Sequence, residues 1–379
     1  MNFNISNEHK MLRELYEAFT INEVEPLAKE VDEDERFPIE TVEKMKSLGF
    51  FGIPFPKEYG GQGGDNLAYA MAVEELSKAC GTTGVIISAH TSLCAAPIYE
   101  FGNEAQKQKY LIPLAKGDKI GAFGLTEPNA GTDAAGQQTK AVLNGDHYIL
   151  NGSKIFITNA GYADVYIIMA MTDIEKGLKG ISAFIVDGDA EGFTIGKKEE
   201  KMGIRGSATS ELIFENVKVP AENLIGKEGQ GFKIAMKTLD GGRIGIASQA
   251  LGLAQGALDE TIKYVKERKQ FGRAISKFQN TQFQLADMST KIEASRLLVY
   301  SAAKAKDDKL NYSTHAAMAK LFASETAMEV TTKAVQLHGG YGYTREYPVE
   351  RMMRDAKITE IYEGTSEVQK MVIAGKLLK

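Results

Sequence analysis

The stretch TKAVLNGDHYILNGSKIFIT, residues 139–158, lies in a part of the chain where the spacing of apolar residues is typical of strands and not of helices. It holds short runs of β-branched and aromatic residues separated by Asn, Gly and Asp, a composition typical of strands and turns. Asn144-Gly145 stands between two of these runs and can supply the positive φ that a tight hairpin turn requires. The stretch therefore predicts a pair of antiparallel strands joined by a short turn.

Similar short runs continue on both sides of this hairpin, from about residue 119 to about residue 225. Strands this short and this close together favour a compact antiparallel barrel or sandwich. Outside this region, apolar residues recur at a spacing of three to four, which indicates amphipathic helices. One long helix is expected to include residues 247–265. Three more helices after it, the last of them the segment after Ser366, would pack antiparallel as a bundle.

The sequence thus predicts an α+β protein of several domains, in the order helices, strands, helices. We expect an N-terminal α-helical domain over residues 1–118, a middle antiparallel β-barrel or sandwich over residues 119–228 and a C-terminal four-helix bundle over residues 229–379. A chain of 379 residues is long enough for each domain to bury its own core.

Composition and charge exclude several classes of function. Lys and Arg number 45 against 50 Asp and Glu, so a net charge of -5 gives no electrostatic basis for binding nucleic acid or an anionic membrane. The apolar runs are too short to span a bilayer, and the amphipathic N-terminus is not a signal or transit peptide. Two cysteines and five scattered histidines suggest neither a disulfide framework nor a metal site. We expect a cytoplasmic protein with no metal, no membrane insertion and no nucleic-acid partner.

Three glycine clusters, at residues 59–65, 226–232 and 337–343, raise the question of nucleotide binding. None forms G-x-G-x-x-G after a strand, and none forms G-x-x-x-x-G-K. The usual dinucleotide-binding and P-loop folds are therefore excluded. Each cluster taken alone is explained well by a flexible turn, and Gly339-Gly340 suits the C-terminal end of a helix.

The segment GLTEPNAGTDAAG, residues 124–136, is more unusual. Thr126, Thr132 and Asp133 flank its small residues, so hydroxyl and backbone N–H groups could line a polar ligand closely. A solvent-exposed loop explains the same composition about as well. The residues of this segment alone leave both interpretations open.

Four segments carry a resemblance to a known family. They are GLTEPNAGTDAAG (124–136), ERKQFGRAISKFQNTQFQLADM (267–288), QLHGGYGYTREYPVERMMRD (336–355) and IYEGTSEVQ (361–369). In this order, and with helices on both sides of the strands, the chain resembles the acyl-CoA dehydrogenase family over essentially its whole length. The resemblance implies a homotetramer with FAD between the β domain and the C-terminal bundle. It also implies that an acyl-CoA thioester is oxidised to the trans-2-enoyl-CoA, and that electrons pass to an electron-transferring flavoprotein.

Matching the family's motifs position by position implies a first group of cofactor contacts. Phe156 stands where the family often has Trp, and it keeps an aromatic face for stacking on the isoalloxazine ring. Thr132 is expected to reach the substrate as well as the flavin. The backbone near the C-terminus is also expected to touch FAD. This group comprises Phe123, Leu125, Thr126, Thr132, Phe156, Thr158, Thr365 and Glu367.

A second group is expected to reach the FAD of a neighbouring subunit. Arg268 and Gln279 resemble residues that contact the diphosphate and adenosine of that FAD. An Arg fork suits phosphate oxygens, although Arg268 alone would be interpreted as the solvated end of a basic helix. The backbone of the QLHGG segment is expected to approach the same cofactor, through Gln336, Leu337, Gly339 and Gly340.

Three glutamates, Glu360, Glu363 and Glu367, are candidates for a catalytic base. The implied reaction needs one poorly solvated carboxylate, whose pKa is raised toward the working pH, aimed at the substrate α-carbon. Ser366-x-x-Gln369 is a capping-box pattern, which would place Glu367 in the first turn of a helix, where the helix dipole lowers its pKa. Glu360 is interpreted as a surface or structural acid.

The resemblance assigns the base to Glu363, which occupies the family's position in YEGT. Its own backbone N–H is expected to help hold the thioester oxygen as negative charge develops there. Some members instead carry the base on an earlier helix, at the position that matches Gly242. A glycine has no carboxyl group, so this chain belongs to the majority arrangement.

The expected acyl-CoA contacts also follow from the resemblance. Asp240 and Arg243 resemble the family's CoA contacts, and Gly364 would let the substrate approach the backbone. The segments RIGIASQALGLAQ and ITEIYEG look most like the bacterial short-chain branch. In that branch, the positions that match Ile246, Gln249 and Thr359 shorten the acyl pocket.

A pocket that ends in Gln and Thr suits a four-carbon chain, because a longer one would clash or leave polar groups unpaired. Butyryl-CoA is therefore the expected substrate. The alternative is that the three residues simply pack between helices, and that the substrate is a medium-chain or branched-chain acyl-CoA.

The residues also bear on two other classes of function. A flavin oxidase or monooxygenase could use the same fold, but Glu363 and the CoA-type segment LDGGRIG argue against it. A non-catalytic helical scaffold would leave Glu363, Arg268 and Gln279 without a shared purpose. The residues therefore favour a flavin-dependent dehydrogenase.

Overall fold

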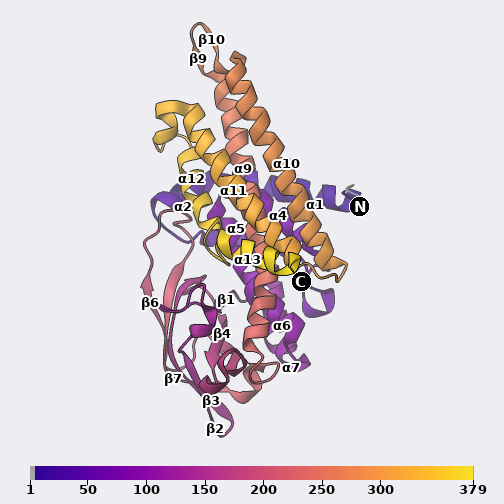
Figure 1. Ribbon diagram of the computed structural model, residues 1–379, viewed down its shortest axis with the longest axis vertical. Helices are drawn as coiled ribbons and strands as arrows, with labels where there is room; N and C mark the ends of the chain where they lie inside the picture. The colour runs from indigo at the N-terminus through magenta and orange to yellow at the C-terminus, as the bar shows by residue number, and fades with distance from the viewer. Residues whose placement is uncertain (1–4, 379) are drawn as a thin grey trace.

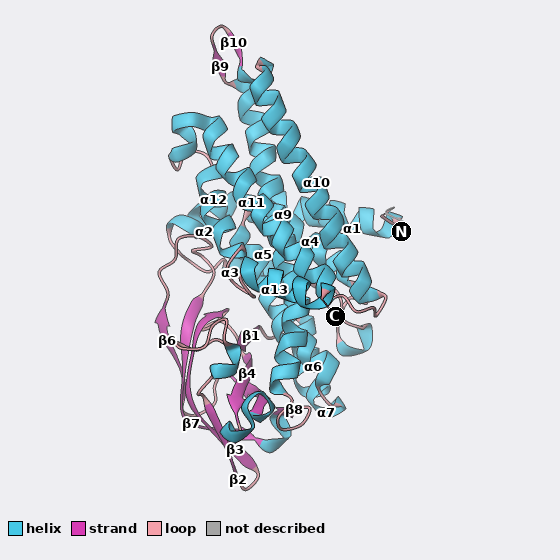
Figure 2. Ribbon diagram, in the orientation of Figure 1, coloured by secondary structure: helices cyan, strands magenta, loops and turns pink. Residues whose placement is uncertain are grey.

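The predicted order of helices, strands and helices is the order observed. The structure, a computed structural model, describes residues 5–378, and Figure 1 shows an elongated molecule. The large sheet lies at the lower end of that view, and the long C-terminal helices run from it to a small hairpin at the upper end (Figure 2). The N-terminal helices pack along the middle of the molecule, where α4 lies against α9.

The N-terminal region is helical, as its apolar spacing predicts. Its longest helix, α4, begins after Asp65, whose side chain accepts a hydrogen bond from the Ala68 N–H at 2.8 Å. Between α5 and α6 the chain continues through π-helical turns. The helices of this region are α1 (Asn7–Phe19), α2 (Ala28–Glu33), α3 (Ile39–Ser47), α4 (Asn66–Ala79), α5 (Gly81–Ser88), α6 (Ala96–Phe101), α7 (Glu104–Gln106) and α8 (Ile112–Lys116).

The middle region forms one sheet in which most neighbouring strands are antiparallel. The strand order is β6-β7-β3-β2-β4-β5-β8, and β1 pairs with β4 off this path. The strands are β1 (Gly121–Gly124), β2 (Lys140–Asn144), β3 (His147–Thr158), β4 (Val165–Met171), β5 (Ile181–Asp187), β6 (Phe193–Lys198), β7 (Thr209–Pro220) and β8 (Leu224–Ile225).

Two details differ from the expected antiparallel hairpins. The β2–β3 hairpin is present, but Asn144 pairs with His147, so the turn consists of Gly145 and Asp146 and only Gly145 has a positive φ, of +64°. In addition, β1 runs parallel to β4, and β2 meets β4 in parallel at one residue pair. A long loop, not a tight turn, follows β1, so no hairpin fixes its direction.

The C-terminal region forms the predicted helical bundle, but it has five helices where the sequence predicted four, the last of them after Ser366. The helices α9 (Gly231–Glu267), α10 (Gln279–Asp307), α11 (Ser313–His338) and α12 (Val349–Thr359) pack on one another, whereas α13 (Ser366–Leu377) packs on α11. The structure has one helix more than predicted because the chain after α11 forms the separate short helix α12 before the turn at Glu363–Gly364. Gly339 ends α11 with a φ of +62°, which confirms its predicted place at the helix end.

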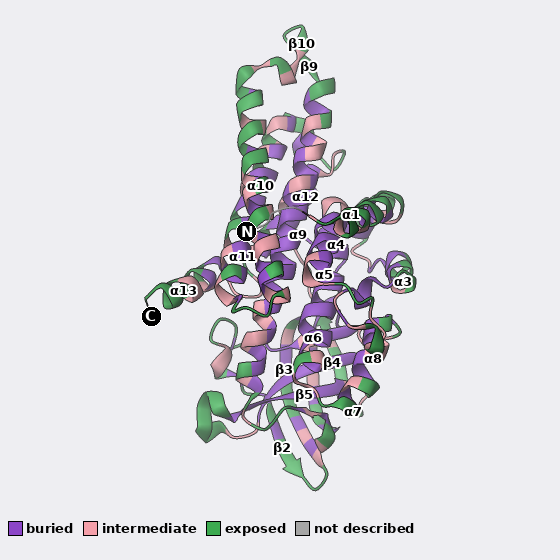
Figure 3. Ribbon diagram, turned by 90° about the vertical axis from the view of Figure 1, so that its right-hand side faces the viewer, coloured by how far each residue is buried: buried purple, intermediate pink, exposed green. Residues whose placement is uncertain are grey.

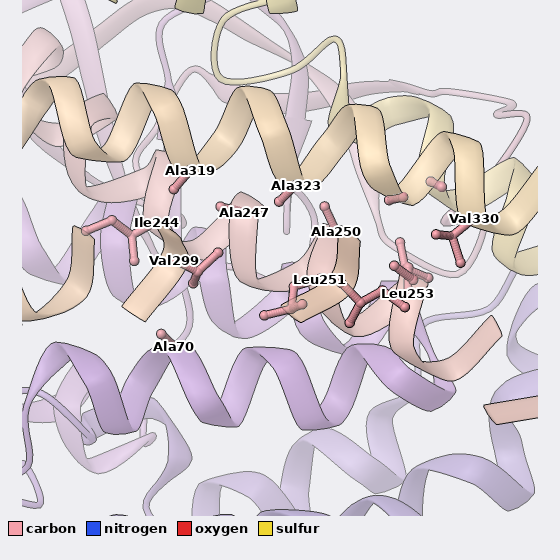
Figure 4. Close-up of a cluster of buried hydrophobic side chains, with 14 of the residues drawn as sticks. Ala70, Ile244, Ala247, Ala250, Leu251, Leu253, Val299, Ala319, Ala323 and Val330 are labelled. Atoms are coloured by element: carbon pink, nitrogen blue, oxygen red, sulfur yellow. The ribbon is translucent and has the colours of Figure 1, made fainter. Parts of the chain in front are cut away.

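Alanine and glycine bring the helices of the bundle close together. Figure 4 shows Ala70 of α4, Ala247 and Ala250 of α9, and Ala319 and Ala323 of α11 facing one another in the core. A Cβ on the glycine at position 252 would lie 2.2 Å from a backbone carbonyl oxygen of α4, so this crossing requires glycine. The close packing makes α9 a rigid support for the residues at its N-terminal half.

The surface shows two further features. Among residues 5–378, none of the helices combines the length and the apolarity needed to cross a membrane. Figure 3 shows α13 extending from the side of the bundle, with Met371 and Leu377 at 69% and 73% exposure. At the far end of the bundle, Phe271 is 93% exposed in the turn between β9 (Lys269–Gln270) and β10 (Arg273–Ala274).

Candidate active site

Glu363 lies in the turn between α12 and α13, and the backbone of this turn is unusual. The φ angle is +53° at Glu363 and +94° at Gly364. A non-glycine residue in the left-handed region costs about 1 kcal/mol or more, so neighbouring groups must hold it there. Lys320 Nζ donates to the Gly364 carbonyl oxygen at 2.7 Å. Gln369 Nε2 donates to the same oxygen at 2.8 Å and to the Glu363 carbonyl oxygen at 3.3 Å.

The carboxyl group of Glu363 is buried, although the residue as a whole is half-buried. Its Oε2 atom has no hydrogen-bond partner within the described chain. A Cβ built on Gly242 of α9 would lie 2.1 Å from this oxygen, so glycine at position 242 leaves the carboxyl group its space. Burial raises the pKa of Glu363 to about 8 and outweighs the opposing effects of Lys320 and Arg243. A free carboxylate with this pKa can accept a proton near neutral pH.

Two buried cations accompany this carboxyl group. Lys320 of α11 and Arg243 of α9 both act on Glu363 through their positive charge. Arg243 donates from Nη1 to Asp240 Oδ1 at 2.6 Å, and the Ser313 hydroxyl donates to the same oxygen at 2.9 Å. Nε of Arg243 is buried and has no partner within the described residues. The two predicted CoA contacts thus lie together beside the predicted base.

The other two glutamates have ordinary surroundings. Glu360 forms an ion pair with Lys357 at 2.6 Å. Glu367 is exposed in the first turn of α13, and hydrogen bonds from its own N–H and from Thr365 lower its pKa, in the predicted direction. The predicted capping box was wrong. Thr365, not Ser366, caps the helix by accepting from the Val368 N–H, because the Gln369 side chain is occupied by the Glu363–Gly364 turn.

The three residues expected to limit the acyl pocket are fully buried next to the base. Gln249 Nε2 donates to the Gly81 carbonyl oxygen at 2.8 Å, and the Tyr362 hydroxyl donates to Gln249 Oε1. Thr359 donates to a carbonyl of its own helix, and Ile246 lies in a small apolar cluster against which Tyr362 packs. Gln249 and Ile246 therefore lie against Tyr362, the neighbour of Glu363.

A buried ion pair holds the loop that follows β1. Lys154 Nζ donates to Glu127 Oε1 at 2.7 Å and to the Leu125 carbonyl oxygen at 3.1 Å. Glu127 in turn accepts from the backbone N–H groups of Gln138 and Thr139, at 2.5 and 3.0 Å. Both charged side chains are almost completely buried. The pair therefore fixes both ends of the loop against β3.

This loop brings most of the expected flavin contacts to one edge of the sheet. The Ile155 N–H donates to the Thr126 carbonyl oxygen at 2.9 Å, which places Thr126 beside the strand that carries Phe156 and Thr158. Phe156 has a φ of +60° at an irregularity of β3 and is 59% exposed. Leu125 is buried, whereas Thr132 is exposed in the loop. An exposed aromatic ring on a strained residue indicates a surface that another group covers.

The second expected group of contacts lies at the other end of the molecule, near the β9–β10 hairpin (Figure 1). A pocket of about 630 Å³ there is lined by Arg268, Gln336, Leu337, Gly339 and Gly340, all predicted cofactor contacts. Gln279, the first residue of α10, is exposed and is not among the residues that line this pocket.

Three models of one protein family match most of the chain. The family models named acyl-CoA dehydrogenase N-terminal, middle and C-terminal domain match residues 6–118, 122–217 and 229–378. The chain is 66% identical, over the full length of both chains, to the short-chain specific acyl-CoA dehydrogenase of Clostridium acetobutylicum. This chain belongs to the acyl-CoA dehydrogenase family.

Solved structures agree with this assignment. Butyryl-CoA dehydrogenase from Megasphaera elsdenii superimposes with a TM-score of 0.99 at 55% identity, over all of both chains. A chain from a structural study of the electron-transferring flavoprotein of Acidaminococcus fermentans and its electron bifurcation also gives a TM-score of 0.99, at 59% identity over all of both chains.

The residues of this acyl-CoA dehydrogenase fit FAD, the cofactor of the family. In the distal pocket, a Cβ added to Gly339 or Gly340 would meet nothing within 4 Å, so the backbone is open to a ligand. His338 lines the same pocket, and its buried Nε2 has no partner within the described chain. At the sheet edge, Phe156 offers an uncovered aromatic face.

The sequence did not single out Lys320 or the Lys154–Glu127 pair. A signal for Lys320 was present, because it lies on the same helix face as Ala316, Ala323 and Ala327, which are buried. A lysine in such a stripe is normally interpreted as an edge residue that reaches solvent. Lys154 falls in phase with the buried Tyr148 and Leu150 of β3, but the exposed Asn151-Gly152 after Leu150 interrupts the pattern, so it carried no comparable signal.

Proposed function

We propose that this acyl-CoA dehydrogenase catalyses the FAD-dependent α,β-dehydrogenation of a short-chain acyl-CoA, converting butyryl-CoA to crotonyl-CoA or the reverse. The observation that carries the proposal is the buried, unpartnered Oε2 of Glu363, in a space that glycine at position 242 leaves open. The likeness to a short-chain specific relative and to a butyryl-CoA dehydrogenase supports the substrate class.

Glu363 acts as the base that removes the α-proton. Its raised pKa makes the Glu363 carboxylate a stronger base than an ordinary glutamate, which favours removal of a proton from the weakly acidic α-carbon. The Glu363 N–H has no acceptor within the described chain and is free to bond the thioester oxygen, where negative charge develops. FAD, when bound, supplies the acceptor for the β-hydride.

The remaining residues bind and orient the ligands. Asp240, Arg243 and Gly364 hold the CoA thioester, Thr132 contacts substrate and flavin, and Ile246, Gln249 and Thr359 close the acyl pocket. The flavin lies on Phe123, Leu125, Thr126, Phe156 and Thr158, with the backbone at Thr365 and Glu367 beside it. Arg268, Gln279, Gln336, Leu337, Gly339 and Gly340 bind the outer part of the FAD of a neighbouring subunit.

Assembly and electron transfer follow the family. We propose a homotetramer that exchanges electrons with an electron-transferring flavoprotein, and a location in the cytoplasm. We also propose that the chain has three domains, over residues 1–118, 119–228 and 229–379. The exposed apolar residues on α13 and at the β9–β10 tip support burial of these surfaces between subunits.

An anaerobic titration tests the proposal. The purified protein is mixed with butyryl-CoA or with octanoyl-CoA, and the flavin absorption band is followed. Bleaching by stoichiometric butyryl-CoA but not by octanoyl-CoA is the expected result. Equal bleaching by octanoyl-CoA would contradict the roles of Ile246, Gln249 and Thr359, and a yellow protein that neither ligand bleaches would contradict the reaction itself. Rapid oxygen consumption by the reduced enzyme would instead indicate an oxidase.

A further inference from the structure

Lys320 is a charged residue in a place where the fold requires none. Its side chain is fully buried within an alanine-rich face of α11. No carboxylate oxygen of the described residues lies within 4 Å of its Nζ, so it has no direct ion pair. A buried charge without a close counter-ion destabilises the folded state. A methionine would fill the same space without this cost.

The contacts of Lys320 lead to the active site. Its Nζ donates to the Gly364 carbonyl oxygen at 2.7 Å, and Gln369 donates to the same oxygen from the opposite element, α13. These two donors hold the turn in which both Glu363 and Gly364 have a positive φ. The orientation of the Glu363 carboxyl group and of its free N–H depends on this turn.

We propose that Lys320 is a positioning residue for the base: its ammonium group, together with Gln369, clamps the Glu363–Gly364 turn, and its charge favours the ionised carboxylate. The inference rests on the proposed function, because it gives Lys320 a purpose only if Glu363 is the base. It adds a role for Lys320 in setting the pH range in which the enzyme works.

The charges around the pair define what removal of Lys320 would change. Glu363 is influenced by Lys320 of α11 and by Arg243 of α9, and Tyr69 of α4 and Tyr362 are uncharged neighbours. Arg243 is already engaged by Asp240. Of these two cations, Lys320 is therefore the one that forms no direct ion pair with a carboxylate of the described residues.

The acids near Lys320 lie on the two elements that flank the turn. Glu360 at the end of α12 and Glu367 in α13 act on Lys320 together with Glu363, and Arg243 opposes them. Glu360 and Glu367 have their own partners, Lys357 and the N-terminus of α13. Removal of the Lys320 charge should therefore affect mainly Glu363, and it should raise the pKa of that carboxyl group further.

The test measures the rate constant of flavin reduction by butyryl-CoA under anaerobic conditions as a function of pH. Lys320→Met removes the charge and the hydrogen bond while keeping the volume. We expect the rate constant at pH 7 to fall at least tenfold, and the acid limb of the profile to move up by about one pH unit. Lys320→Arg should restore the position of the limb.

Gln369→Met is the matched control, since it removes a donor to the same carbonyl oxygen without changing the charge. The rate constant should fall severalfold with the acid limb in place. An unshifted limb in Lys320→Met would overturn the proposal whatever the rate, because a purely structural lysine would not move it. If Lys320→Met does not fold, Gln369→Met decides: a wild-type rate in that variant overturns the clamp.

Failure of the proposed function has a different signature. The wild-type flavin would then resist reduction by butyryl-CoA, or Glu363→Gln would retain turnover. Either result is independent of the behaviour of the Lys320 variants.

Discussion

At the scale of single residues, Glu363 combines two features that folded proteins usually avoid. Its backbone is left-handed and its carboxyl group is buried without a hydrogen-bond partner in the described chain. Each feature costs stability, and both are found at the residue that we propose as the unsolvated base. Gly242, Lys320 and Gln369 are the neighbours that make the arrangement possible.

Gly242→Ala tests the space around the base. The added Cβ would lie 2.1 Å from Glu363 Oε2 and 2.7 Å from a methyl carbon of Leu93, so the carboxyl group must move. A displacement of this size at a reacting group should lower kcat about 100-fold while FAD remains bound. Steady-state kinetics and the flavin content check this expectation. Gly375→Ala is the control, because a Cβ there meets nothing within 4 Å.

At the scale of elements, the loop between β1 and β2 depends on one buried ion pair. Lys154 and Glu127 connect its two ends and the strand β3, which together carry the expected flavin contacts. Removing one partner of a buried pair leaves an uncompensated charge and destabilises a protein by about 3–5 kcal/mol. The loop should therefore lose its order before the helical regions do.

Lys154→Met is expected to release FAD during gel filtration and to lower the melting temperature. The double variant Lys154→Met/Glu127→Gln leaves no unpaired charge and keeps a side-chain acceptor for the Gln138 and Thr139 N–H groups, so it should recover much of the melting temperature. Flavin content per chain and thermal unfolding measure both effects. Full retention of FAD by Lys154→Met would show that the pair does not organise the flavin loop.

How far the sequence predicts the structure depends on the range of the interactions. Periodicity correctly predicted the order of helical and strand regions and the β2–β3 hairpin, because these depend on neighbouring residues, but it predicted one C-terminal helix too few. The sequence assigned the positive φ of the hairpin turn to Asn144 and Gly145, but only Gly145 has one. The sequence also did not predict that β1 pairs in parallel with β4. Strand pairing across a long loop is decided by tertiary contacts that no local pattern records.

The site shows the same limit. The motifs singled out Glu363, whose Oε2 is buried, and several residues that line the distal pocket, since each belongs to a recognisable segment. The assignment of the cap to Ser366 was wrong because Gln369, the presumed partner in the capping box, bonds the turn at Gly364 instead. Lys320 lies 43 positions before Glu363, and only the packing of α11 on the turn brings the two together.

At the scale of the whole molecule, the expected cofactor contacts form two separate groups, and the second lies near the β9–β10 hairpin, which Figure 1 shows at the far end of the bundle. Phe156 and its neighbours lie on the sheet, whereas Arg268 and its neighbours lie at the tip of the bundle. A complete FAD site would then need two subunits, which couples cofactor binding to assembly. The tip also carries Phe271, whose high exposure would be reduced by contact with another subunit.

Arg268→Ala tests this coupling. Loss of a charge-assisted hydrogen bond to a phosphate should weaken FAD binding about tenfold or more. Apoprotein reconstituted with FAD, followed by fluorescence and by sedimentation, reports affinity and subunit number together. Lys266→Ala, an exposed cation in the last turn of α9 that does not line the pocket, should behave as wild type.

The measurement that tests the central claim most directly is the single-turnover reduction of the bound flavin by butyryl-CoA in the wild type and in Glu363→Gln. In the wild type the rate constant should increase as the pH rises toward 8, because the carboxyl group must lose its proton before it can act as the base. Glu363→Gln should retain FAD and bind butyryl-CoA, yet reduce its flavin at least 1000-fold more slowly at every pH. Reduction by Glu363→Gln at the wild-type rate would remove Glu363 from the reaction.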